Sequence, residues 1–134
     1  MLDGKKIIVI IPARGGSKGI PKKNLKKFLG KPLVEHSIDY AKESQFVDQI
    51  ILSTDDIKIM SIGQKHKITL VERPRKIAGD SATTESAIEH IIKLFNFSEQ
   101  TIIILLQPTS PLRPTNSLDK MLNIFIKDKY DSML

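Results

Sequence analysis

Short apolar runs alternate along the chain with segments in which apolar residues recur at helical spacing. The runs consist mostly of Ile, Leu and Val without polar alternation, which is typical of strands buried on both faces of a sheet. Such runs occupy residues 7–11, 49–53, 68–71 and 101–106. The pattern therefore predicts four strands of a parallel sheet.

Helices are predicted between these strands. Two sets of apolar residues follow the spacing i, i+3, i+4, i+7, which places each set on one helical face: Ile88, Ile91, Ile92 and Phe95, and then Leu118, Met121, Leu122 and Phe125. Weaker patterns predict helices over 32–44 and 55–66, and Asn116 with Asp119 predicts the start of the last helix. Because alternating strands and helices form right-handed crossovers, we expect a mostly parallel sheet covered by helices on both faces.

The length of the chain limits its domain organisation. A chain of 134 residues is enough for one hydrophobic core. Residues 130–134 have the pattern of a strand that is just beginning. We therefore expect residues 1–134 to be part of one domain that is truncated at its C-terminal end, with a short edge strand as the alternative.

Positive charge is concentrated at the start of the chain. Residues 1–31 hold nine Lys or Arg against one acidic residue and the remainder holds twelve against fourteen, so the two parts carry +8 and −2 and sum to +6. This distribution and the 5% of aromatic residues disfavour a nucleic-acid-binding domain. The sequence also lacks an apolar stretch of ~20 residues, a signal peptide and any cysteine. We expect a cytoplasmic protein that binds neither membrane nor nucleic acid.

Polar loops follow the predicted strands, at the edge where parallel α/β sheets bind their ligands. These loops cover residues 12–24, 53–56, 72–84 and 107–114. The first loop places Gly15 and Gly16 between Arg14 and Lys18. Backbone N–H groups flanked by two cations favour a polyphosphate. The loop has neither the P-loop nor the dinucleotide-binding pattern, so an ordinary glycine-rich turn is the alternative.

Four motifs taken together resemble the acylneuraminate cytidylyltransferases, the CMP-N-acetylneuraminic acid synthetase family. They are Arg-Gly-Gly-Ser-Lys-Gly-Ile-Pro-Lys-Lys-Asn at 14–24, Leu-Ser-Thr-Asp-Asp at 52–56, Glu-Arg-Pro at 72–74 with Ala-Gly-Asp at 78–80, and Leu-Leu-Gln-Pro-Thr-Ser-Pro-Leu-Arg at 105–113. The family couples CTP to a nine-carbon sialic acid and releases pyrophosphate. The resemblance implies a Rossmann-like three-layer α/β/α sandwich of the nucleotide-diphospho-sugar transferase type, and a homodimer of the full-length protein.

The resemblance also implies roles for individual residues. Arg14, Lys18 and Lys23 would be catalytic, because fixed cations stabilise the charge that develops on phosphoryl oxygens. Gln107 would lie between nucleotide and sugar. Mg²⁺ would be the cofactor, with its ligands beyond residue 134 and none in this chain. The nucleotide-binding residues would be Arg14, Gly15, Gly16, Ser17, Lys18, Asn24, Arg73, Asp80, Ala82 and Thr84.

Several alternatives remain open at this point. The sugar could be legionaminate or pseudaminate, and a non-catalytic nucleotide-binding module is a hypothesis of another class. Asp55 and Asp56 are interpreted first as a helix cap, which is compatible with a place on the pocket floor. We expect the remaining polar residues of note to lie on the surface or to support packing; these are Lys26, Lys27, Lys31, His36, His66 and His90.

Overall fold

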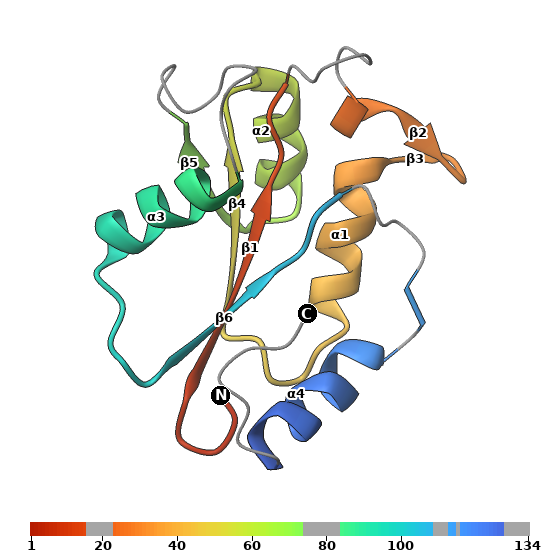
Figure 1. The fold of residues 1–134 in the computed structure, drawn as a ribbon. Helices are drawn as coiled ribbons and strands as arrows, with labels where there is room; N and C mark the ends of the chain where they lie inside the picture. The colour runs from red at the N-terminus through yellow and green to blue at the C-terminus, as the bar shows by residue number, and fades with distance from the viewer. Residues whose placement is uncertain (16–22, 74–83, 109–112, 115, 128–134) are drawn as a thin grey trace.

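Four parallel strands form the central sheet of the protein (Figure 1). The computed structural model describes residues 1–15, 23–73, 84–108, 113–114 and 116–127. Across the sheet the strand order is β5-β4-β1-β6. The strands are β1 (Lys6–Pro12), β4 (Gln49–Thr54), β5 (Thr69–Glu72) and β6 (Thr101–Leu105).

Strand β1 lies at the centre of this sheet. It pairs with β4 on one side, where Ile10 is opposite Ile51, and with β6 on the other, where Ile8 is opposite Ile103. The side chains from Ile7 to Ile11 are completely buried. Burial on both faces explains why this strand is continuously apolar, as the sequence pattern indicated.

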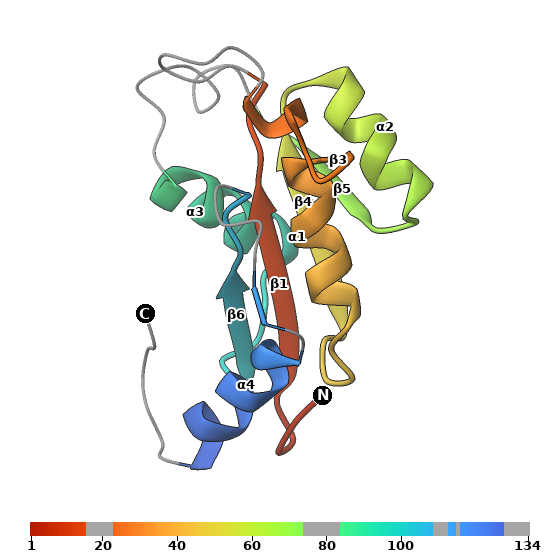
Figure 2. The ribbon, with the colours of Figure 1, turned by 90° about the vertical axis from the view of Figure 1, so that its right-hand side faces the viewer.

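Helices cover both faces of the sheet (Figure 2). Helices α1 (Leu33–Lys42), α2 (Ile57–Lys65) and α4 (Ser117–Lys127) contribute apolar side chains to a core with alternate β1 residues. Helix α3 (Thr84–Phe95) contributes Ile91 to a second core on the opposite face, against Ile8 and Ile10. The predicted three-layer α/β/α sandwich is therefore confirmed. None of the described helices has the length and apolar character needed to cross a membrane.

Between β1 and α1 the chain contains small elements that the sequence pattern did not predict. A 3-10 turn, η1 (Lys23–Leu25), precedes a hairpin formed by β2 (Lys27–Phe28) and β3 (Lys31–Pro32). The two turn residues, Leu29 and Gly30, have φ angles of 52° and 82°. Positive φ at both positions is what a two-residue type I′ hairpin requires. Strands of two residues are too short to have a recognisable hydrophobic period.

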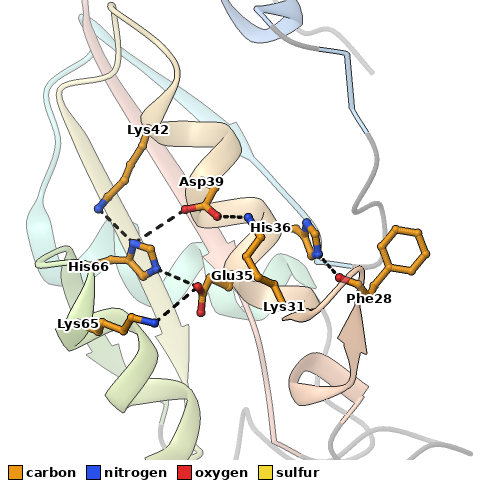
Figure 3. Close-up of polar contacts among 8 residues, drawn as sticks. All are labelled: Phe28, Lys31, Glu35, His36, Asp39, Lys42, Lys65 and His66. Atoms are coloured by element: carbon orange, nitrogen blue, oxygen red, sulfur yellow. Dashed lines mark hydrogen bonds and ion pairs between the residues drawn. The ribbon is translucent and has the colours of Figure 1, made fainter.

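Polar contacts hold the hairpin and α2 against α1 (Figure 3). Nε2 of His36 lies 2.5 Å from the carbonyl oxygen of Phe28 and therefore donates to it. His66, at the end of α2, lies with Nε2 3.6 Å from a carboxylate oxygen of Glu35, and its Nδ1 accepts from Lys42 over 3.1 Å. The expectation that these two histidines support packing is confirmed. The strand predicted at 130–134 lies outside the described residues.

Candidate functional site

The described loops after β1, β4 and β5 meet at the carboxyl edge of the sheet (Figure 1). The backbone N–H of Ala13 donates to the carbonyl oxygen of Ser53 over 2.8 Å, and that of Arg73 donates to Thr54 over 2.9 Å. These bonds extend the strand pairing by one residue on each side of β4. Arg14 and Arg73 thus leave the sheet from β1 and β5, the two strands that flank β4.

The first turn of the loop after β1 is held from two directions. The N–H of Gly15 donates to Oδ1 of Asp55 over 2.7 Å. On the other side, Nδ2 of Asn24 donates to the carbonyl oxygen of Arg14 over 2.8 Å. Asn24 is only 8% exposed, so its amide is committed to this contact inside the fold. Arg14 and Gly15 are therefore fixed by the end of β4 and by η1.

Glycine is required at position 15 by space rather than by a special φ angle. A Cβ at this position would lie 2.7 Å from Oδ2 and 2.8 Å from Cβ of Asp56. Any larger side chain would push the loop away from the start of α2. The close approach of Asp56 explains why residue 15 is glycine. The composition of the loop by itself indicates only a glycine-rich turn.

The two aspartates after β4 have different tasks. Asp56 is the N-cap of α2, and its Oδ1 accepts from the backbone N–H groups of Lys58 at 2.8 Å and Ile59 at 3.2 Å. Asp55 instead accepts from Gly15. The cap predicted for this pair is thus made by Asp56, while Asp55 belongs to the loop contacts.

Arg73 is a buried cation at the end of β5, only 6% exposed. Its Nε donates to Oγ of Ser53 over 3.1 Å. Burial lowers the pKa of Arg73 most, while the charge of Asp55 raises the pKa and that of Arg14 lowers it. Arginine remains protonated in proteins, so Arg14 and Arg73 bring two positive charges into a region that also holds the carboxylates of Asp55 and Asp56. Guanidinium groups at strand ends can bind an anionic ligand such as a phosphate.

The loop after β6 has an arginine that the sequence analysis did not assign. Nη2 of Arg113 donates to the carbonyl oxygen of Gln107 over 2.7 Å, and Nη1 donates to Oγ of Ser37 over 3.3 Å. Its guanidinium also lies over the ring of Tyr40. Gln107 is exposed. Arg113 therefore connects the backbone of Gln107 to α1. Its place in the motif at 105–113 was the feature of the sequence from which a role could have been predicted.

The structure places only part of the predicted site. It brings together Arg14, Gly15, Asn24 and Arg73, and it places Gln107 after the strand beside β1. Lys23 begins η1 and Thr84 begins α3. The remaining predicted residues lie outside the described part of the chain; these are Gly16, Ser17, Lys18, Asp80 and Ala82.

The described residues also bear on metal binding. Within 1–15, 23–73, 84–108, 113–114 and 116–127, no three His, Cys, Asp or Glu side chains are grouped as a cation site. The carboxylate of Asp55, next to the end of β4, accepts from the Gly15 amide and raises the pKa of Arg73.

Curated relatives with sequences similar to this chain are cytidylyltransferases that act on different sugars. The chain is 38% identical over 128 residues to the pseudaminic acid cytidylyltransferase of Campylobacter jejuni, covering 92% of this chain and 55% of that protein. It is 33% identical over 120 residues to the N-acylneuraminate cytidylyltransferase of Escherichia coli, covering 90% and 28%. The CMP-N,N'-diacetyllegionaminic acid synthase of Legionella pneumophila is 34% identical over 119 residues, covering 84% and 50%. The chain thus spans about half the length of these relatives or less.

Solved structures show the same fold. A CMP:2-keto-3-deoxy-manno-octonic acid synthetase complexed with CTP superposes with a TM-score of 0.76 at 23% identity, over 93% of this chain and 49% of that one. A 4-diphosphocytidyl-2C-methyl-D-erythritol synthase gives a TM-score of 0.69 at 15% identity, over 89% and 54%. The cytidylyltransferase family model matches residues 8–134. Arginine side chains lie beside a glycine turn at the strand ends, and the family model matches nearly the whole length of the chain. The chain therefore belongs to the cytidylyltransferase family.

Proposed function

We propose that the full-length protein transfers the cytidylyl group of CTP to a nine-carbon nonulosonic acid, giving a CMP-sugar and pyrophosphate. The observation that carries this proposal is the meeting of Arg14, Gly15 and Arg73 at the strand ends of a cytidylyltransferase domain. The curated relatives support the sugar class, because they are named for pseudaminic, N-acylneuraminic and legionaminic acids.

In the proposed reaction the anomeric hydroxyl of the sugar attacks the α-phosphorus of CTP. A bond forms between that oxygen and phosphorus, the bond from phosphorus to the bridging oxygen breaks, and the hydroxyl loses its proton as pyrophosphate leaves. Negative charge develops on phosphoryl oxygens, so fixed cations and exact positioning supply most of the catalysis. We assign the cationic role to Arg14, Lys18 and Lys23, with Asn24 holding the backbone of Arg14.

The remaining residues of the proposed site recognise the nucleoside and the sugar. Arg73, Asp80, Ala82 and Thr84 would surround cytosine and ribose, and Gln107 would lie between nucleotide and sugar. Gly15, Gly16 and Ser17 complete the loop around the phosphates. A buried arginine is a suitable reader of a base edge because its donors are held in one fixed plane.

Mg²⁺ belongs to this proposal as a cofactor that would neutralise phosphate charge when bound. Within the described residues no group of three His, Cys, Asp or Glu side chains is suited to a cation, so this proposal names no ligand for it. The homodimer of the full-length protein and its cytoplasmic location stay predictions.

Legionaminate and pseudaminate are the alternative sugars, and the identities of 34% and 38% to enzymes named for them support both. Pyrophosphate release by the full-length protein with CTP and N-acetylneuraminate, legionaminate or pseudaminate would identify the substrate. The expected result is release with one of these sugars only. Release with none of them would contradict the proposed reaction.

Nucleotide binding is tested separately by calorimetry on the full-length protein. We expect CTP to bind much more tightly than ATP or UTP, and Arg14→Ala to weaken CTP binding by roughly tenfold to a hundredfold without unfolding the protein. Equal affinity for the three nucleotides would argue against base recognition around Arg73. CTP binding without pyrophosphate release would instead favour a non-catalytic nucleotide-binding module.

A further inference from the structure

Asp55 has contacts that neither the cap of α2 nor the proposed reaction requires. Its Oδ1 accepts the backbone N–H of Gly15 over 2.7 Å, from a residue forty positions away in the chain. A hydrogen bond from an amide to an ionised carboxylate is stronger than one to a neutral acceptor. The first turn of the loop after β1 is therefore fastened to the end of β4 by a charged group.

The same carboxylate acts on Arg73. This guanidinium is almost fully buried, which lowers its pKa, and the nearby charge of Arg14 lowers the pKa further, whereas Asp55 raises it. A buried cation beside a second cation is costly unless an anion compensates it. Asp55 supplies such an anion, two residues after Ser53, to which Nε of Arg73 donates.

We propose that Asp55 is a positioning residue that joins the phosphate-binding turn at Arg14 and Gly15 to the buried Arg73, so that both halves of the nucleotide site are held in one arrangement. The role rests on the proposed function, since it concerns the binding of CTP. Asp55 acts through Gly15 and Arg73 and needs no contact of its own with the nucleotide.

Whether CTP binds more tightly or more weakly after Asp55 is replaced tests this role. A carboxylate near a triphosphate repels it, so charge alone predicts that removing Asp55 tightens CTP binding. Positioning predicts the opposite, because the turn loses its charged acceptor and Arg73 loses an anion that compensates its charge. Asp55→Asn is the informative change, since it removes the charge and keeps an oxygen that can accept from Gly15. Asp55→Ala removes both.

The neighbouring Asp56 offers a matched control. Asp56→Asn makes the same change in net charge one residue further along, and asparagine also caps helices well. The cap contacts of Asp56 with Lys58 and Ile59 should survive this change. We expect Asp56→Asn to bind CTP no more weakly than the wild type does.

The experiment compares these three variants in the full-length protein by calorimetry with CTP and by amide hydrogen exchange without nucleotide. We expect Asp55→Asn to bind CTP roughly threefold to tenfold more weakly and Asp55→Ala roughly tenfold to thirtyfold more weakly. Exchange at the Gly15 amide should accelerate in Asp55→Ala and stay unchanged in Asp56→Asn. If Asp55→Ala does not fold, Asp55→Asn decides the affinity test.

A double-mutant cycle separates positioning from a general loss of stability. Asp55→Asn and Arg73→Lys should together weaken CTP binding by less than the product of their separate factors, because they disturb one coupled unit. Additive effects, or tighter CTP binding by Asp55→Asn, would overturn the role of Asp55. Absence of CTP binding by the wild type would overturn the proposed function instead, and unchanged exchange at Gly15 in Asp55→Ala would overturn the fastening of the turn.

Discussion

Arg113 lies over the ring of Tyr40, with its guanidinium carbon 5.1 Å from the ring centroid. The same guanidinium donates to the carbonyl oxygen of Gln107 and to Ser37. Burial lowers the pKa of Arg113 first, and Tyr40 opposes this. One side chain thus connects the loop after β6 to two residues of α1, so the position of Gln107 depends on α1.

Replacing Arg113 with lysine tests whether the shape of its guanidinium matters in addition to its charge. Lysine keeps the positive charge but loses the planar fork that reaches Gln107 and Ser37 together. We expect Arg113→Lys to lower the free energy of unfolding by about 1–2 kcal/mol, measured by urea denaturation. In the full-length protein the KM for the sugar should rise more than the KM for CTP, because Gln107 is the residue displaced.

The control for this prediction is Tyr40→Phe. Phenylalanine keeps the ring face below Arg113 and removes the hydroxyl that contacts Ser117. The KM for the sugar should then stay near that of the wild type, whatever the loss of stability. An equal rise in both variants would show that the link between Arg113 and Gln107 does not position the site.

The contacts of Asp48 predict that the stability of the fold depends on pH. Its carboxylate accepts from the N–H of Ile7 over 2.7 Å and from the N-terminal ammonium over 2.9 Å. The bond from Ile7 and then that from the ammonium lower the pKa of Asp48 below its ordinary value. The stabilisation is therefore complete above the pKa of the unfolded chain and is lost as the pH falls through the lower pKa of the folded state.

Asp48→Asn should accordingly have a lower melting temperature than the wild type at pH 7. The difference should shrink as the pH falls below about 4, where the unfolded aspartate becomes protonated. Melting curves at a series of pH values, followed by circular dichroism, measure both effects. A difference that stays constant down to the acid transition would show that the charge of Asp48 does not contribute.

The sequence was sufficient to predict the long strands and helices, because the pattern of buried residues that determines them is visible within each segment. Strand β1 is buried on both faces, so its five apolar residues are readable as a strand without knowledge of its partners. The hairpin of β2 and β3 was missed because its strands contain two residues each. Its pairing depends on a turn at Leu29 and Gly30, and Leu29 is not a residue that predicts a positive φ.

The sequence motifs predicted several residues of the candidate site but not the contacts between them. Arg14, Asn24 and Arg73 were selected by motif, and the structure brings them to one edge of the sheet. The bond from Gly15 to Asp55 was not predictable, because it depends on the register that places Pro12 opposite Ser53. Register is set by the packing of whole strands rather than by any one motif.

Removing the helix cap at Asp56 should cost about 1 kcal/mol of unfolding free energy. In Asp56→Ala the backbone N–H groups of Lys58 and Ile59 lose the side-chain oxygen that accepts from them. Asp56→Asn keeps an acceptor and should remain within about 0.5 kcal/mol of the wild type. Urea denaturation of the two variants tests this, and equal losses would show that the charge of Asp56 matters more than its cap.

Gly63, in the last turn of α2, should not tolerate alanine although alanine is the better helix former. A Cβ at this position would lie 2.3 Å from Cδ2 of Leu70 and 2.9 Å from Cδ2 of Leu52, on the strands beneath the helix. Alanine gains up to about 1 kcal/mol from helix propensity, whereas overpacking a core costs about 1–3 kcal/mol. Because Leu52 is fully buried and has little room to move, we expect Gly63→Ala to lower the free energy of unfolding by about 1 kcal/mol net. Ser61→Ala on the exposed side of the same helix is the control and should be neutral or slightly stabilising, so a stabilised Gly63→Ala would mean that α2 does not pack this closely on the sheet.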